Sequence, residues 1–136
     1  MSLQYKRYEP NGRFQTERND CVVRAISKAM NLNYSVAHTI VRDATGRKNR
    51  RGANLRHVME YLHIEGIDGD KLKSQVDNGY TNSVRYPTLA QVADLMQRGK
   101  FVVRISGHAF AVIDGVQYDT SKNGARTRVL NIYEVI

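Results

Sequence analysis

Three residue types that together can form a nucleophilic site stand far apart in this chain. Cys21 is the only cysteine and opens an apolar helical run, His108 opens an apolar strand, and Asp119 ends the next strand. A thiolate can attack a carbonyl carbon, an imidazole can exchange a proton with it, and a carboxylate can orient the imidazole. These residues are therefore our candidates for a nucleophile, its base and the group that orients the base.

A predicted hairpin brings two of these residues together. An Asp-Gly dipeptide at 114–115 separates two apolar runs, which is the strongest short signal for a type I′ turn. A two-residue turn makes Ile113 face Val116, and the alternation of side chains then places His108 and Asp119 on one face of the sheet. Asp119 becomes the diagonal neighbour of His108, about 7–8 Å away at the backbone and within side-chain reach. A slip of one residue would separate them.

The position of Cys21 at a helix start favours a thiolate. Such a start carries partial positive charge and free amides, and these amides can also receive the oxyanion of a tetrahedral intermediate. Gln15 could donate its side-chain amide to the same oxyanion. The alternatives are a cysteine that packs as a small core residue, a polar histidine–aspartate pair at strand ends, and a glutamine in a polar loop.

The elements that would position these residues follow from apolar periodicity. Helical spacing predicts a first helix over 21–30, with Asn19 or Asp20 as its cap. A second helix is predicted over 36–44, where Gly46 ends it, and a third over 55–62, where Asn54 caps it. A fourth helix is predicted from Pro87-Thr88 to Gly99. Strands are predicted over 101–105, 109–113, 116–119 and 128–135, and the pattern over 64–86 is ambiguous. Helices followed by an antiparallel sheet indicate an α+β fold, and the length indicates a single domain over residues 1–136.

The chain is strongly basic, with 21 Lys and Arg against 13 Asp and Glu and a formal net charge of +8. Such a charge favours acidic partners without identifying one. The densest basic segment, 47–56, offers five candidate binding residues: Arg47, Lys48, Arg50, Arg51 and Arg56. This segment is either a solvated loop or a surface that binds an acidic protein or nucleic acid.

Several classes of protein do not fit the sequence. One cysteine excludes an internal disulfide and a cysteine-rich zinc site, and neither an HExxH spacing nor a glycine-rich phosphate loop occurs. We therefore expect no metal and no cofactor. No apolar stretch is long enough to cross a bilayer, and the first residues lack the apolar core of a signal peptide. We expect a cytoplasmic protein without a membrane partner, and the oligomeric state stays open.

The order Gln15, Cys21, His108, Asp119 resembles the papain-like cysteine peptidase superfamily. In that superfamily a glutamine precedes the nucleophile by six positions, as Gln15 precedes Cys21 here. The cysteine begins a central helix, the histidine begins a core strand, and an Asn or Asp follows on a neighbouring strand. Val22 replaces the usual aromatic residue after the cysteine. The segment 107–115 is also similar to small phage-encoded members of the superfamily.

The resemblance implies a papain-like fold and a thiol hydrolase, either a peptidase or an isopeptidase, that acts on a protein or peptide in the cytoplasm of a phage-infected bacterium. Gln15 and the amide of Cys21 would stabilise the oxyanion. Two alternatives remain open: an acyl transferase that uses the same site, and a catalytically weak papain-like protein that binds an acidic host protein or nucleic acid through the segment 47–56.

Overall fold

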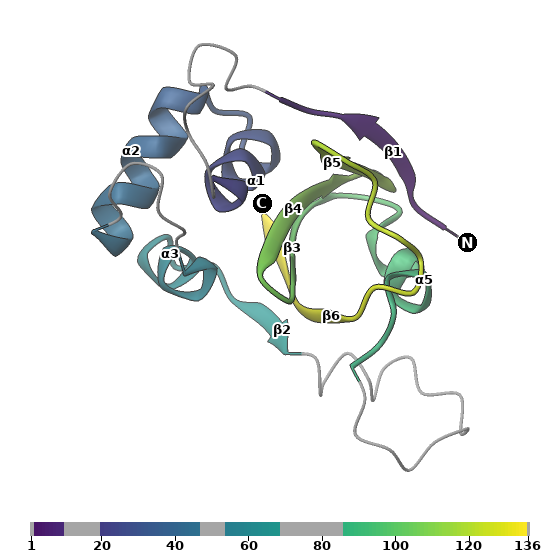
Figure 1. Cartoon of the computed structure of the whole chain (residues 1–136). Coiled ribbons are helices and arrows are strands. Elements are labelled where there is room, and N and C mark those ends of the chain that lie inside the picture. Colours follow the sequence, from purple (N-terminus) through teal and green to yellow (C-terminus); the bar gives the residue numbers. More distant parts are fainter. Residues whose placement is uncertain (1, 10–19, 47–53, 69–85, 136) are drawn as a thin grey trace.

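A six-stranded sheet forms the centre of the structure, and helices lie on both of its sides (Figure 1). The computed structural model describes residues 2–9, 20–46, 54–68 and 86–135. The strands are β1 (Gln4–Arg7), β2 (Gly66–Asp68), β3 (Lys100–Ile105), β4 (His108–Ile113), β5 (Val116–Asp119) and β6 (Val129–Val135). Their order across the sheet is β1-β5-β4-β3-β6-β2.

The predicted helices are present, with one difference. They are α1 (Cys21–Ala29), α2 (Tyr34–Thr45) and α3 (Leu55–Tyr61), followed by α5 (Leu89–Val92), which continues as the 3₁₀ helix η2 (Ala93–Met96). The fourth predicted helix is therefore α-helical only in its first turn. Thr88 and Gln91 form a capping box at its start, as this sequence pattern favours. Apolar spacing of three and four residues over so short a segment fits both kinds of helix, so it could not separate them.

The prediction of an α+β fold is confirmed, but the sheet is mixed rather than wholly antiparallel. The pairs between β2, β6, β3, β4 and β5 are antiparallel. In contrast, β1 pairs with β5 in parallel, from Gln4 opposite Val116 to Arg7 opposite Asp119. Sequence patterns missed β1 because its four residues, QYKR, show no apolar alternation. They missed β2 because it has only three residues and lies in the ambiguous stretch.

The predicted β4–β5 hairpin is confirmed in turn and register. Ile113 pairs with Val116, and the pairing continues to Ala111 opposite Tyr118. Asp114 and Gly115 have φ values of 48° and 78°, and a type I′ turn requires positive φ at both positions. The turn is also held from outside, because the amide of Gly115 donates to the carbonyl of Met96 at 2.8 Å.

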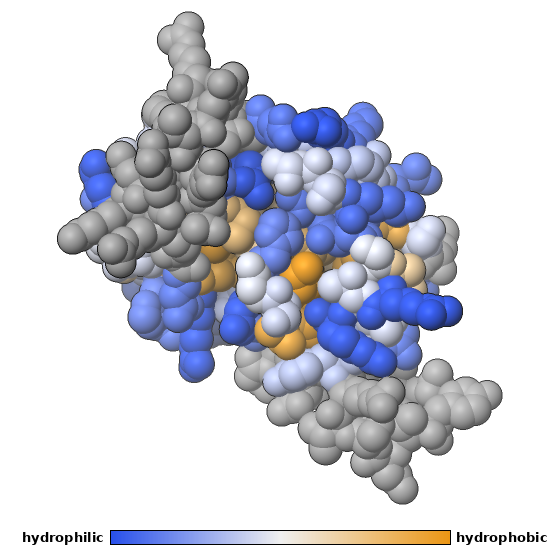
Figure 2. Space-filling view, in the orientation of Figure 1, coloured by the Kyte–Doolittle hydropathy of each residue, from blue (hydrophilic) through white to orange (hydrophobic). Residues whose placement is uncertain are grey.

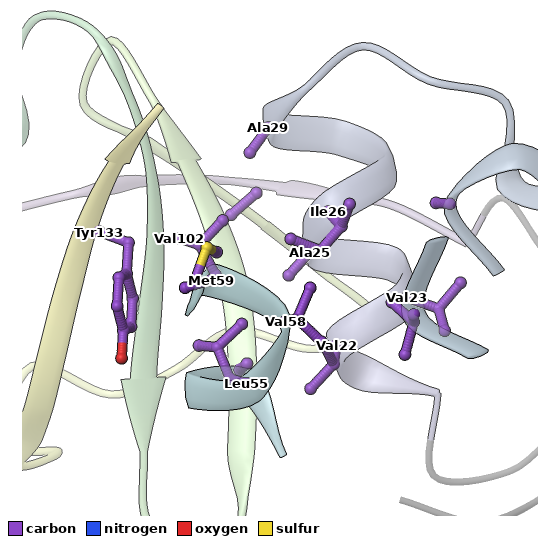
Figure 3. Packing of buried hydrophobic residues seen from close by; sticks show 14 of the residues in the cluster. Val22, Val23, Ala25, Ile26, Ala29, Leu55, Val58, Met59, Val102 and Tyr133 are labelled. Atoms are coloured by element: carbon purple, nitrogen blue, oxygen red, sulfur yellow. The ribbon is translucent and has the colours of Figure 1, made fainter. Parts of the chain in front are cut away.

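Two apolar clusters fill the two sides of the sheet. The first joins α1, α2 and α3 to the sheet and includes Ile26, Met59 and Val102 (Figure 3). The second joins α5 and η2 to the neighbouring residues of the same strands, such as Phe101 and Val103. Side chains that alternate along β3 thus enter opposite clusters, as the period of two in a strand requires. The sheet is buried on both sides.

The visible face of the molecule is largely hydrophilic, with small apolar areas between polar side chains (Figure 2). Within the described ranges, the helices are too short or too polar to span a bilayer.

Candidate active site

Cys21 is the first residue of α1, and small residues bring this helix start close to the sheet. Ala25 and Ala29 of α1 belong to the same buried cluster as Ala109 and Ala111 of β4. Alanine side chains let a helix approach a strand closely. The start of α1 therefore lies beside the start of β4, where the thiol of Cys21 and the ring of His108 form a hydrogen bond.

His108 is the first residue of β4 and follows a tight turn in which Gly107 has a φ of 68°. Its side chain is 28% exposed, so the ring is only partly buried. The ring of Phe110, two residues along the same face, stacks against it with centroids 6.2 Å apart. This contact supports the ring from the side of the core.

Asp119, the last residue of β5, lies where the hairpin register predicted. Its Oδ2 is 2.5 Å from Nε2 of His108, and its side chain is 2% exposed. The backbone amide of Thr120 donates to its Oδ1 at 2.7 Å. An imidazole has two nitrogens, so the contact of Nε2 with Asp119 leaves Nδ1 to face the thiol of Cys21. The structure thus brings the three candidates into one chain of contacts.

Asn123 completes the surroundings of Asp119 and was not found from the sequence. Its Nδ2 donates to Oδ2 of Asp119 at 2.9 Å and to Oε1 of Gln117 at 3.0 Å. Gln117 also accepts from the backbone amide of Asn123 and donates to its carbonyl. The buried amide of Gln117 therefore holds the loop after β5 in the position from which Asn123 reaches the carboxylate. No local pattern predicts this contact, because it depends on the path of an irregular loop.

Arg24 and Asp20 were also missed as parts of the site. One nitrogen of Arg24, Nη1, pairs with Oδ1 of Asp20, and its Nη2 lies 3.7 Å from Oδ1 of Asp119. Tyr34 of α2 donates a hydrogen bond to Oδ2 of Asp20 at 2.8 Å. Helical spacing could have found this pair, because residues three and four positions apart share a face, and Arg24 follows Asp20 by four and Cys21 by three.

The predicted position of the α1 cap is correct, but the side chain does not form the expected capping hydrogen bond. Asp20 is the N-cap residue, yet its side chain makes no capping hydrogen bond. Its carboxylate turns instead toward Arg24 and Tyr34. In an α-helix the first amides have no partner within the helix, so those at the start of α1 are not occupied by the cap side chain.

The pKa values of the three groups support an ion pair of thiolate and imidazolium. Burial raises the pKa of Cys21, but the hydrogen bond from His108, the backbone of Ala109 and the nearby positive charges outweigh it, so the pKa is lowered. The hydrogen bond with Asp119 and then that with Cys21 raise the pKa of His108 to about 9, against the effect of burial. Burial also raises the pKa of Asp119, but the hydrogen bonds from His108 and Asn123 lower it overall.

The remaining predicted site residues are Gln15 and the basic residues of the segment 47–56. Gln15, Arg47, Lys48, Arg50 and Arg51 lie outside the described residues. Arg56 is described; its side chain is 76% exposed and lies 3.4 Å from Glu60 one turn along α3. Part of its charge is therefore balanced within the helix. In the part of the chain that is described, no three His, Cys, Asp or Glu side chains are grouped as metal ligands would be.

Comparisons of this chain with protein-family models, with curated proteins and with solved structures found no match.

Proposed function

We propose that this protein is a thiol hydrolase that cleaves amide or ester bonds of a protein or peptide, with Cys21 as nucleophile. The observation that carries the proposal is the contact chain from Cys21 through His108 to Asp119. Such a chain combines a thiol whose pKa is lowered, an imidazole positioned to move a proton, and a buried carboxylate that orients it. We further propose that the α+β fold is papain-like, with the nucleophile at the start of a helix that packs on the sheet.

The first half of the reaction forms a thioester. The thiolate of Cys21 attacks the substrate carbonyl carbon, a carbon–sulfur bond forms, and the carbonyl electron pair moves to oxygen. The amides at the start of α1 would receive this oxyanion, together with Gln15 if its side chain reaches the site. When the intermediate collapses, the bond to the leaving amine or alcohol breaks, and His108 gives that group its Nδ1 proton.

The second half releases the acyl group and restores the site. Neutral His108 takes a proton from water, and the water oxygen attacks the thioester carbonyl. Collapse of the second intermediate breaks the carbon–sulfur bond, releases a carboxylic acid and returns the thiolate. Asp119 stays ionised throughout, because its role is to hold the ring and to stabilise its positive charge.

The test is to trap the acyl-enzyme. With p-nitrophenyl acetate near neutral pH, the wild type should release a burst of nitrophenol and gain the mass of one acetyl group in intact-protein mass spectrometry. The variant Cys21→Ala contains no thiol and should show neither. A folded wild type that never acquires the acetyl group, or a Cys21→Ala variant that still does, would show that the proposal is wrong.

The His108→Ala variant separates an activated thiol from an ordinary one. Without the imidazole, acetylation of Cys21 should slow by a factor of about 10² or more, since general acid–base groups contribute on that order. Adding an amine during deacylation then separates hydrolysis from acyl transfer. Release of acetate supports the hydrolase, whereas transfer of the acetyl group to the amine would instead identify an acyl transferase that uses the same thioester.

A further inference from the structure

Arg24 occupies a position between the two ends of the candidate site. Its guanidinium pairs with Asp20 just before the helix start and approaches Asp119 behind the histidine, at 3.7 Å. Both carboxylates have side chains only 2% exposed, and that of Arg24 is 13% exposed. At this degree of burial charges are weakly screened, so each acts strongly on its neighbours.

The guanidinium is held through its two terminal nitrogens. Among the described residues its third nitrogen, Nε, is buried and has no hydrogen-bond partner. The planar fork of an arginine can reach two carboxylates at once, whereas the ammonium group of a lysine acts as one point charge. The contacts of Arg24 therefore tie α1, which carries the thiol, to β5, which carries Asp119.

The balance of charge around the thiol depends on this residue. The groups that face the site are Asp20 and Arg24 from α1, Tyr34 from α2, His108 from β4 and Asp119 from β5, with the hydroxyl of Tyr5 from β1 on the Asp119 carbonyl. Without Arg24, two buried carboxylates would oppose the thiolate, and His108 would be the remaining positive charge that favours it, beside the hydrogen bond from the backbone of Ala109. A like charge nearby disfavours ionisation, and an opposite charge favours it.

We propose that Arg24 is a positioning residue for the thiol chemistry, which joins the start of α1 to Asp119 and supplies a positive charge that keeps Cys21 ionised. This inference rests on the proposed function, because it concerns the same thiol. Its effect would be largest on the population of the thiolate and would appear before any substrate binds.

The experiment measures the rate of Cys21 alkylation by iodoacetamide against pH, in the full chain. One thiol is present, so the rate reports Cys21 alone. In Arg24→Gln the apparent pKa of the thiol should rise by about one unit, so alkylation well below this pKa becomes about tenfold slower. Arg42→Gln is the control, because it removes the same charge from an exposed position on α2 and should leave the profile unchanged.

A second variant separates an electrostatic role from a purely structural one. Asp20→Asn keeps the size of the side chain but removes a negative charge, so it should lower the apparent pKa of Cys21. An electrostatic role predicts opposite shifts for Arg24→Gln and Asp20→Asn, whereas loss of local structure would raise the pKa in both. Shifts in the same direction, or an Arg24→Gln profile like that of the wild type, would overturn the inference.

Folding and the proposed function are distinguished in the same measurement. If Arg24→Gln does not fold, Arg24→Lys is the replacement variant, because it keeps the charge but cannot bridge both carboxylates. In Arg24→Lys the apparent pKa of Cys21 should rise by a smaller amount. An unchanged pKa in Arg24→Lys together with an unchanged pKa in Asp20→Asn would then overturn the inference. A wild-type thiol with an ordinary pKa of about 8.5 would overturn the proposed function itself.

Discussion

At the scale of residues, His108 links the other groups of the candidate site. One ring nitrogen contacts a carboxylate at 2.5 Å, and the ring also forms a hydrogen bond with the thiol. An imidazolium donates from both nitrogens, so it can bridge two anions at once. This arrangement explains why the pKa of His108 is raised to about 9 and that of Cys21 is lowered. Both shifts favour the pair of a thiolate and an imidazolium over a neutral thiol beside a neutral ring.

The Asp119→Asn variant tests the larger of the two hydrogen bonds that raise the pKa of His108. It keeps the shape of the side chain but removes the charge and the strongest acceptor for the histidine. In an NMR titration we expect the midpoint of His108 to fall from about 9 toward the ordinary value of about 6.5. A midpoint that stays near 9 would show that Cys21 alone raises the pKa.

At this scale the sequence predicted the three groups that the structure brings together but not the residues that support them. Cys21, His108 and Asp119 were predicted, since the chain has one thiol and the hairpin register aligns the other two. Arg24 lies at a helical spacing from Cys21 and was overlooked, although its signal was present. Asn123 had no signal, because its approach to Asp119 depends on contacts with Gln117 in an irregular loop.

At the scale of elements, the β4–β5 turn sets the distance between histidine and aspartate. Gly115 has a φ of 78°, and a Cβ added there would lie 2.8 Å from Oε1 of Gln97. That side chain now donates to the carbonyl of Ala93 at 3.0 Å. The turn therefore favours glycine for its backbone conformation, and a larger residue would also displace the end of the Gln97 side chain.

The Gly115→Ala variant should lose stability for both reasons. Positive φ costs a residue with a Cβ about 1–2 kcal/mol, and displacement of Gln97 should cost about 1 kcal/mol more. Gly46→Ala is the matched control, because Gly46 has a φ of 69° but open space around it. Urea unfolding should show the larger loss for Gly115→Ala. Equal losses would mean that the contact with Gln97 does not matter.

At the scale of the whole molecule, the strand that carries Asp119 is bound to the N-terminal part of the chain. The backbone carbonyl of Asp119 accepts hydrogen bonds from the amide of Tyr8 at 2.9 Å and the hydroxyl of Tyr5 at 3.1 Å. These tyrosines belong to β1 and the residues after it, which lie beside β5 (Figure 1). The strand that carries the carboxylate is thus held between β4 and an N-terminal strand.

The His108–Asp119 pair should make global stability depend on pH. The folded pKa of His108, about 9, exceeds its unfolded value of about 6.5. The stability that the pair contributes is therefore fully present below about pH 6.5 and is lost as the pH rises through about 9. The lowered pKa of Cys21 acts in the opposite sense, because its contribution is lost as the pH falls through the folded value.

Comparison of the wild type with Asp119→Asn separates the contribution of the His108–Asp119 pair to stability from that of the thiol, since both proteins keep Cys21. In urea unfolding, the free energy of unfolding of the wild type should exceed that of Asp119→Asn most at about pH 6. This difference should shrink above about pH 9. A difference that is constant over this range would show that the pair does not act through the charge of His108.

The sequence by itself determined the features that depend on residues close together along the chain. Apolar periodicity predicted α1, α2, α3 and the C-terminal strands, and the Asp-Gly turn predicted the register that joins His108 to Asp119. The tertiary structure alone decided which distant segments meet. It placed the start of α1 beside β4, added the four residues of β1 in parallel to β5, and turned Asp20 toward Arg24 instead of the helix cap. Such choices depend on packing across the sheet, where the free energy of burial outweighs the weak preferences of short polar segments.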